Sequence, residues 1–260
     1  MSTAFDLMVA PNGARKSRAD HPGLPLTAAD LAETARACEA AGATALHVHV
    51  RDAEGRHTLD AEAYRATLGA IRAVSDLRLQ ITTEAAGIFD VAAQIDCLRA
   101  GLAPEASVAL REIERAPERL AEAYRVAEAA GTRVQHILYA PEDLTRLVAH
   151  RDAGTIPETF DSVLFVLGRY SDGQRAAPRD LDPFLAALGP TPLRWAVCAF
   201  GPREQDCLLY ALDRGGDVRI GFENNHTAPD GEPFADNAAA VAALVSAAAR
   251  AGFHPGKKIL

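Results

Sequence analysis

The sequence alternates along its whole length between short apolar runs with strand character and longer segments whose apolar residues recur at helical spacing. The alternation repeats eight times. The predicted strands are Phe5–Ala10, Ala45–Arg51, Leu77–Thr83, Ala106–Leu110, Val134–Tyr139, Ser162–Leu167, Arg194–Phe200 and Val218–Glu223. The predicted helices are Ala28–Ala41, Ala61–Val74, Val91–Ala100, Pro117–Ala130, Glu142–Ala153, Asp180–Leu188, Glu204–Arg214 and Asp236–Ala251. A glycine follows most of these helices, as left-handed helix caps favour.

Eight strand–helix units in 260 residues match the size and order of a (β/α)8 barrel, whose catalytic groups gather at the carboxyl ends of its strands. A doubly wound open sheet is the alternative. The GxGxxG motif that such a sheet usually carries after its first strand is missing here. We find no linker or low-complexity tract. The sequence therefore predicts an α/β fold with one domain over residues 1–260, a (β/α)8 TIM barrel.

Composition excludes several classes of protein. A hydrophobic share of 48% with 24% charged residues is too apolar for a disordered chain. The net charge of −8 and the lack of a basic block argue against nucleic-acid partners, and no signal pattern or long uncharged apolar stretch predicts a membrane partner. We therefore expect a cytoplasmic protein, and its alanine-rich outer helices suggest a homo-oligomer. Without a CxxC pair, the four cysteines are expected to be buried, reduced thiols: Cys38, Cys97, Cys198 and Cys207.

Two histidines lie one step apart on the second predicted strand. Period-two alternation sends His47, His49 and Arg51 to one face and apolar residues to the other. Because apolar residues face the helices, the histidines are expected in the barrel lumen, where they suit a divalent metal such as zinc. Histidines that hydrogen-bond within a core are the alternative explanation.

The last predicted strand offers a third ligand. Alternation places Arg219 and Glu223 on one face, and in a closed barrel this strand is separated from the second by the first strand alone. Glu223 can then approach both histidines, and two His with one Glu leave a coordination position open for catalysis. The alternative is an Arg219–Glu223 ion pair that fills the lumen.

Other polar residues end strands as well, where they could bind an oxyanion or a carboxylate, although such residues often satisfy only the local backbone. We expect His57, His150 and His254 on the surface. The strand-end residues are Asn12, Thr82, Thr83, Glu84, Ser107 and Arg203.

With these residues assembled, nearly the whole chain resembles the β-keto acid cleavage enzyme family. The His47–Asp52 block and the Val218–Asn225 block are the specific ones. Supporting matches are Asn12-Gly13-Ala14, His21-Pro22 through Thr27, Thr82-Thr83, Pro104–Ser107 and Gly215-Gly216.

The resemblance implies a zinc-dependent acyltransferase that condenses a β-keto acid with acetyl-CoA and cleaves the adduct in a retro-Claisen step, giving acetoacetate and a new acyl-CoA. It implies that His47, His49 and Glu223 hold zinc and that Arg219 steadies developing negative charge or helps the base. The hydroxyls expected to orient the substrates are those of Thr82, Thr83 and Ser107.

The sequence departs from the family pattern where the family usually has an aspartate, the expected proton acceptor, directly after the metal-binding glutamate. This chain has Asn224, and a neutral amide cannot be that base. Glu84 is the substitute candidate, because a carboxylate near a lumen can have a raised pKa.

A second departure concerns the substrate. The family member that acts on an amino acid is expected to have a carboxylate after the first strand that binds the substrate amine, and this chain has none there. Its absence favours substrates with neutral or anionic acyl tails, and Arg15 is a candidate partner for an anionic tail. For the phosphates of coenzyme A, Arg203 is the candidate.

Two other functions stay open at this point. A zinc hydrolase of the amidohydrolase type also carries HxH on a barrel strand, but on the first one, with further histidines at the ends of strands five and six and an aspartate at the end of strand eight. Here HxH is on the second strand, the sixth strand has no histidine, and the last strand ends in Glu223-Asn224. A barrel that binds a small acid or a CoA ester without catalysis would explain the missing aspartate.

Overall fold

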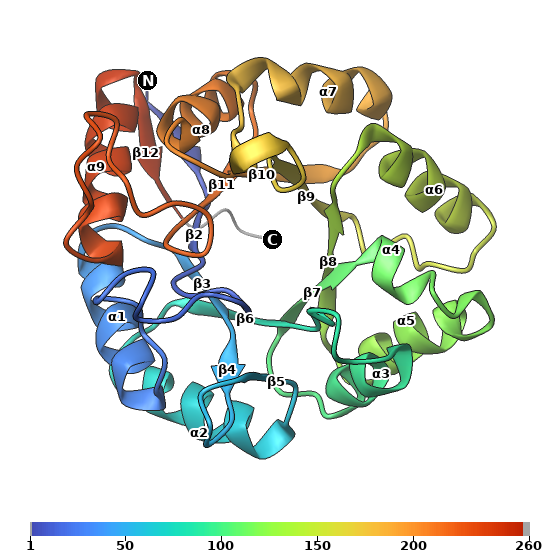
Figure 1. The fold of residues 1–260 in the computed structure, drawn as a ribbon. Helices are drawn as coiled ribbons and strands as arrows, with labels where there is room; N and C mark the ends of the chain where they lie inside the picture. The colour runs from blue at the N-terminus through green and yellow to red at the C-terminus, as the bar shows by residue number, and fades with distance from the viewer. Residues whose placement is uncertain (1, 257–260) are drawn as a thin grey trace.

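The computed structural model describes residues 2–256, so both ends of the predicted 1–260 domain lie outside the described residues. Eight strands form a closed barrel in the order β10-β11-β2-β3-β6-β7-β8-β9, and every neighbouring pair is parallel (Figure 1). The (β/α)8 prediction is therefore confirmed and the open sheet was wrong. The barrel strands are β2 (Leu7–Val9), β3 (Ala45–Val48), β6 (Arg78–Thr82), β7 (Glu105–Ala109), β8 (Arg133–Leu138), β9 (Ser162–Leu167), β10 (Arg194–Ala199) and β11 (Asp217–Ile220).

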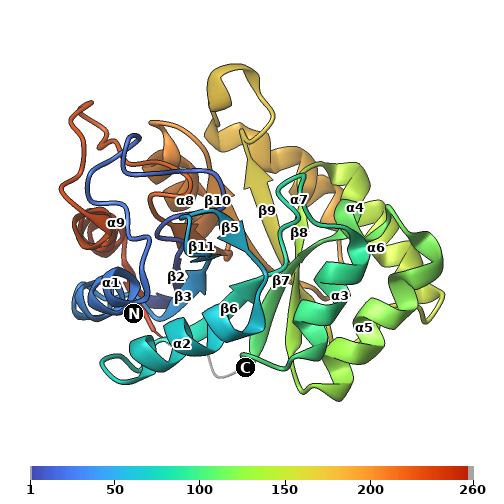
Figure 2. The same cartoon turned by 60° about the horizontal axis from the view of Figure 1, so that its bottom comes forward.

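Helices surround the barrel, one or more after each strand (Figures 1 and 2). Side-chain caps start several of them: Thr27 forms a capping box with Asp30, and Asp60, Asp90 and Asp236 each accept a backbone N–H. The 3-10 turns η1 (Pro117–Arg119) and η3 (Pro178–Leu181) precede α5 and α7, and η2 covers Asp172–Gln174. The α-helices are α1 (Ala28–Ala40), α2 (Ala61–Arg72), α3 (Val91–Arg99), α4 (Leu110–Ile113), α5 (Leu120–Ala129), α6 (Pro141–Asp152), α7 (Asp182–Leu188), α8 (Glu204–Asp213) and α9 (Asn237–Arg250).

Most of the core lies between the barrel and the helices, where alternate strand residues such as Leu46, Ile81 and Phe165 are buried. A smaller apolar cluster, including Ile137, Val166 and Phe200, is separate from this layer. The cysteine prediction is confirmed, because all four thiols are buried and free. Within residues 2–256, no helix has both the length and the apolarity to cross a bilayer.

Three strand predictions are corrected at their ends. Phe5–Ala10 is split, because β1 (Thr3–Phe5) leaves the barrel and pairs with β12 (Phe253–Pro255). Ala45–Arg51 breaks after Val48, and β4 (Val50–Arg51) pairs antiparallel with β5 (His57–Thr58). The last strand ends at Ile220 rather than at Glu223. These breaks depend on partners distant in the sequence, which a local pattern does not contain.

Candidate metal centre and active-site pocket

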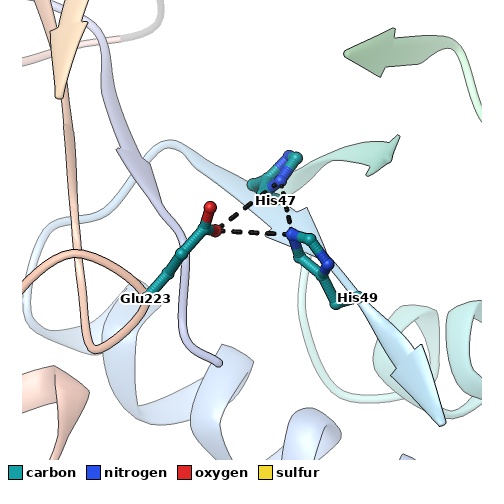
Figure 3. Close-up of side chains that lie close together, drawn as sticks. All are labelled: His47, His49 and Glu223. Atoms are coloured by element: carbon teal, nitrogen blue, oxygen red, sulfur yellow. Dashed lines mark hydrogen bonds and ion pairs between the residues drawn. The ribbon is translucent and has the colours of Figure 1, made fainter. Parts of the chain in front are cut away.

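His47, His49 and Glu223 point toward one another at the carboxyl end of the barrel strands (Figure 3). The two histidine Nε2 atoms lie 3.1 Å apart, and Glu223 Oε2 lies 3.7 Å from Nε2 of His47 and 3.4 Å from that of His49. Tetrahedral zinc with bonds of about 2.0–2.2 Å would hold its ligands roughly 3.3–3.6 Å apart. The three donor atoms are therefore close to the spacing that a metal ion requires.

The barrel order explains how residues so far apart in the sequence meet. β11 pairs with β2 and β2 with β3, so the chain after β11 crosses one strand to reach the histidines, as predicted. Asn12, which follows β2, donates its amide to the carbonyl of His49 at 3.1 Å and to that of Pro25 at 3.0 Å. Asn12 thereby fixes the backbone of a candidate ligand, and it does not line the pocket.

Glu223 lies on a turn, not on the strand that alternation predicted. Gly221 has φ +139°, and a Cβ on it would collide with the carbonyl of Ala10. The chain therefore turns at Gly221, and the amide of Glu223 donates to the Ala10 carbonyl at 3.0 Å. Gly13 packs against the side chain of Glu223, since a Cβ on Gly13 would lie 2.7 Å from Glu223 Cγ.

A glutamine behind His47 sets the orientation of its ring. The Gln80 amide oxygen lies 2.8 Å from His47 Nδ1, and the Gln80 amide nitrogen donates to Gln135 at 3.1 Å. Since the Gln80 oxygen can only accept, Nδ1 carries the proton and Nε2 keeps its lone pair toward Glu223. This is the arrangement that a metal-binding histidine requires.

Several buried polar atoms at this centre have no hydrogen-bond partner among residues 2–256. They include Glu223 Oε2, His49 Nδ1, Nε and Nη1 of Arg219, and both amide atoms of Asn224. A buried polar group without a partner costs about 1–3 kcal/mol, and native interiors seldom leave one. A cluster of them indicates a place shaped for a ligand.

Arg219 is the nearest cation to the candidate ligands. Its guanidinium lies 3.2 Å from Glu223 Oε1 and 3.5 Å from Cys198 Sγ. Burial acts to raise the pKa of Glu223, but Arg219 and the two histidines outweigh it and hold that pKa well below its usual range. Burial lowers the pKa of His47, with Arg219 acting in the same direction. The carboxylate is thus ionised and the imidazole neutral, as metal ligands must be.

A cavity of about 50 Å³ opens beside the centre. Six residues that the sequence analysis named as candidates line it: Arg15, His47, Thr82, Glu84, Arg219 and Glu223. Sequence analysis missed the contributions of Lys16, Ile137, Tyr139, Val166, Arg169 and Phe200 to its wall. Tyr139 could have been found, because it is the last residue of a predicted strand.

The remaining predicted residues lie outside the cavity wall. Ser107 Oγ donates to Thr82 Oγ1 at 3.3 Å, and the Thr83 hydroxyl donates to the Ser107 carbonyl at 3.0 Å. Asn224 is buried behind the wall. Arg203 is exposed and pairs with Asp206 at 3.2 Å.

His57 corrects a prediction, because it is buried and not on the surface. Its Nε2 lies 2.8 Å from the carbonyl of Glu84, and its ring centroid lies 5.3 Å from that of His49. Burial lowers its pKa to about 4, so the ring is neutral and donates to Glu84. The hairpin of β4 and β5 carries His57 back toward the centre, and that pairing is invisible in the local pattern.

A second buried acid lies behind the Glu223 turn. Glu204, at the start of α8, accepts from the amide of Gly221 and from the side chain of Asn225, both at 3.4 Å. Burial raises its pKa well above the usual range. Glu204 supports the turn that presents Glu223, and sequence analysis missed it because it begins an ordinary amphipathic helix.

Comparison with known proteins is in line with this geometry. A family profile described as beta-keto acid cleavage enzyme matches residues 6–257. The 3-keto-5-aminohexanoate cleavage enzyme of Fusobacterium nucleatum is 27% identical over 229 residues, which cover 82% of this chain and 79% of the relative. The enzyme of the same description from Acetoanaerobium sticklandii is 26% identical over 256 residues, covering 92% and 90%.

Solved structures show the same fold at low identity. ObcA in a binary complex with oxaloacetate superposes with a TM-score of 0.68 at 16% identity over 90% of this chain. The match spans 65% of the length of ObcA. The 3-dehydroquinate dehydratase of Geobacillus kaustophilus gives 0.58 at 16% identity, covering 94% of this chain and 92% of that one.

Proposed function

This chain belongs to the beta-keto acid cleavage enzyme family, and from that premise we propose that it is a zinc-dependent acyltransferase acting on a β-keto acid and acetyl-CoA. The carbon between ketone and carboxylate loses a proton and attacks the acetyl carbonyl, and the CoA thiolate leaves. The thiolate then adds to the original ketone, and the carbon–carbon bond beside it breaks. The products are an acyl-CoA and acetoacetate, which regains the proton.

The observation that carries this proposal is the triad of His47, His49 and Glu223. Its donor atoms converge at ligand spacing, and Glu223 Oε2 has no hydrogen-bond partner among residues 2–256. Two nitrogens and a carboxylate oxygen are a known catalytic zinc set with an open position. A zinc ion held there would act as a Lewis acid toward the ketone and carboxylate oxygens of the keto acid.

Glu84 and Arg219 supply the remaining chemistry in this proposal. Both line the cavity that also contains His47 and Glu223. Glu84 accepts the proton from the keto acid and returns it to acetoacetate, the task that Asn224 cannot perform. Arg219 has two unpartnered N–H directions for the negative charge that develops on the substrate oxygen.

The hydroxyls and the coenzyme have smaller parts. Thr82 borders the cavity and orients substrate, whereas Ser107 and Thr83 act behind it through their hydrogen bonds. A ternary complex of ObcA, a barrel of the same fold, contains a C4-CoA adduct and oxalate, which motivates acetyl-CoA as the co-substrate to test. Arg203 stays our prediction for a phosphate contact.

Acetoacetate formation tests the proposal. Purified protein with stoichiometric zinc is mixed with acetyl-CoA and a panel of β-keto acids, with and without a strong chelator. We expect acetoacetate and an acyl-CoA in equal amounts, and loss of both with the chelator. Zinc-loaded protein that yields no acetoacetate from any keto acid would contradict the proposal.

A further inference from the structure

The active-site cavity has more positive charge than the proposed reaction uses. Arg15, Lys16, Arg169 and Arg219 line it, against two carboxylates, Glu84 and Glu223. Zinc would add two further positive charges, and the single carboxylate of a simple β-keto acid would remove one. A balanced site would need another anion, because uncompensated charge in a partly buried cavity is costly.

Two of these cations have no counter-ion in the protein. Within residues 2–256, the guanidinium groups of Arg15 and Arg169 have no ion-pair or hydrogen-bond partner, and Arg169 lies 5.0 Å over the ring of Phe200. Arginines elsewhere in the barrel behave differently: Arg78 and Arg133 both contact Glu105, and Arg194 contacts Asp161. Arg175 and Arg179 also lack such a partner within residues 2–256, but both are exposed and neither lines the cavity, so half-buried Arg169 is the unpaired arginine that distinguishes this wall.

The cations approach from two segments of the chain. Arg15 and Lys16 lie on the loop after β2, and Arg169 follows β9, whose connecting segment projects beyond the barrel (Figure 2). Lys16 Nζ donates to the carbonyl of Phe222 at 2.6 Å, beside the metal ligand Glu223. Arg169 is half-buried and can present a planar fork to a carboxylate, which binds such a group in two places at once.

The position of these cations indicates whether they bind a carboxylate of the substrate or the phosphates of coenzyme A. The thioester must reach the reacting carbon, and the long pantetheine arm then holds the phosphates far from this carbon. Arg15, Lys16 and Arg169 share a cavity of about 50 Å³ with His47 and Glu223, which favours a partner close to the reacting atoms. Arg169 also borders a neighbouring cavity of about 260 Å³, so the KM for acetyl-CoA is one of the readouts of the test below. The three cations are placed to meet the far end of a short keto acid.

We propose that Arg169, assisted by Arg15 and Lys16, binds a second carboxylate at the end of the acyl tail, so that the substrate is a β-keto diacid. This inference rests on the proposed function, which it narrows to one class of substrate. Each charge-assisted hydrogen bond contributes about 1.5–3 kcal/mol, which corresponds to roughly ten- to a hundredfold in kcat/KM.

The test compares a β-keto diacid with the β-keto monoacid of equal chain length. We expect the wild-type protein to prefer the diacid by about tenfold or more in kcat/KM, and Arg169→Gln to remove most of that preference. Arg15→Gln is expected to reduce it less, since Arg15 is exposed. The matched control is Arg175→Gln, an exposed arginine on the same segment that does not line the cavity, and it should keep the preference.

Three outcomes would overturn the inference. The wild type could use both acids equally, Arg169→Gln could weaken both alike, or it could act only by raising the KM for acetyl-CoA, which would assign Arg169 to the coenzyme. If no keto acid gives acetoacetate, the proposed function fails by itself. Calorimetric binding of the two acids to zinc-loaded wild type and Arg169→Gln then decides the carboxylate subsite independently.

Discussion

The barrel lumen has a charged cluster at each end, and the two differ in how fully their charges are paired. At the amino end, Arg78 contacts Asp6 and lies 2.8 Å from Glu105, which also contacts Arg133 at 3.0 Å. At the carboxyl end, Glu223 and Arg219 keep three buried polar atoms without a hydrogen bond among residues 2–256, compared with one, Arg78 Nε, at the amino end, and that atom is in the ion pair with Glu105. The paired cluster closes the barrel, whereas the unpaired one is prepared for a ligand.

Cavity size alone does not identify the site. The cavity beside the paired cluster has a volume of about 180 Å³, compared with about 50 Å³ at the candidate metal centre, and Arg219 borders both. A third cavity of about 260 Å³ shares Tyr139, Val166 and Arg169 with the candidate site but is not lined by the triad. The 180 Å³ cavity is lined mainly by the first residues of the barrel strands, where (β/α)8 barrels place stability rather than catalysis. Unpaired donors and acceptors therefore identify a site better than volume does.

The replacement of glutamate by glutamine at four positions tests this comparison, and Glu223→Gln should have the largest effect. The amide is a poor zinc ligand, so bound zinc and acetoacetate formation should both fall, the rate by more than the roughly 10–100-fold typical of residues behind a ligand. Elemental analysis and the acetoacetate assay measure the two quantities. Zinc retained at wild-type stoichiometry would show that Glu223 is not a ligand.

Glu84→Gln should separate proton transfer from metal binding at the same end. Loss of a general base typically costs about 100-fold or more in turnover, and Glu84 is not one of the proposed ligands. We expect kcat to fall by that amount with zinc content unchanged. Full turnover in this variant would remove Glu84 as the base.

Glu105→Gln makes the same change at the paired end and should act on stability instead. The change removes a carboxylate partner from both Arg78 and Arg133. We expect the free energy of unfolding to fall by about 2 kcal/mol, and the loss is not larger because Arg133 is partly exposed. Urea denaturation measures this loss, and zinc content should stay at the wild-type level. Lost zinc together with normal stability would break the contrast between the two ends.

Glu204→Gln should have the smallest effect, and its sign depends on pH. Burial raises the pKa of this carboxyl above its unfolded value, so the folded state binds the proton more tightly and stability falls as pH rises from the unfolded pKa toward the folded one. The glutamine variant lacks this loss. In metal-free protein it should exceed the wild type by on the order of 1 kcal/mol at pH 8 and by less at pH 5. An equal difference at both pH values would contradict the raised pKa.

The barrel and the candidate metal triad could be predicted from the sequence because both follow from short periodicities. Alternation in β3 assigned His47 to the lumen, and strand order alone brought Glu223 near it. The conformation around Glu223 was predicted wrongly, because the chain turns at Gly221 and β11 ends at Ile220, three residues before Glu223. Glu223 thus lies beside the two histidines, as predicted, although the strand does not extend that far.

The residues that sequence analysis did not find were missed for a different reason. His57 reaches His49 through the hairpin of β4 and β5, and Arg169 reaches the cavity from the segment after β9. Where such a segment places its side chains depends on loop length and on tertiary contacts, for which sequence periodicity has no signal. Glu204 was missed for a related reason, because the first residue of an exposed-looking helix turns out to be buried.

Gly221 has a consequence for how such an enzyme can diversify. If the proposed site is correct, residues on the cavity wall, such as Arg169, can be exchanged singly to alter which acid fits while the candidate metal ligands remain in place. No side chain can be added at Gly221 without displacing the Ala10 carbonyl and, with it, the anchor of Glu223. We expect a library of single substitutions to tolerate many changes at the wall and almost none at this glycine, so a lineage can change its substrate freely while inheriting its reaction unaltered.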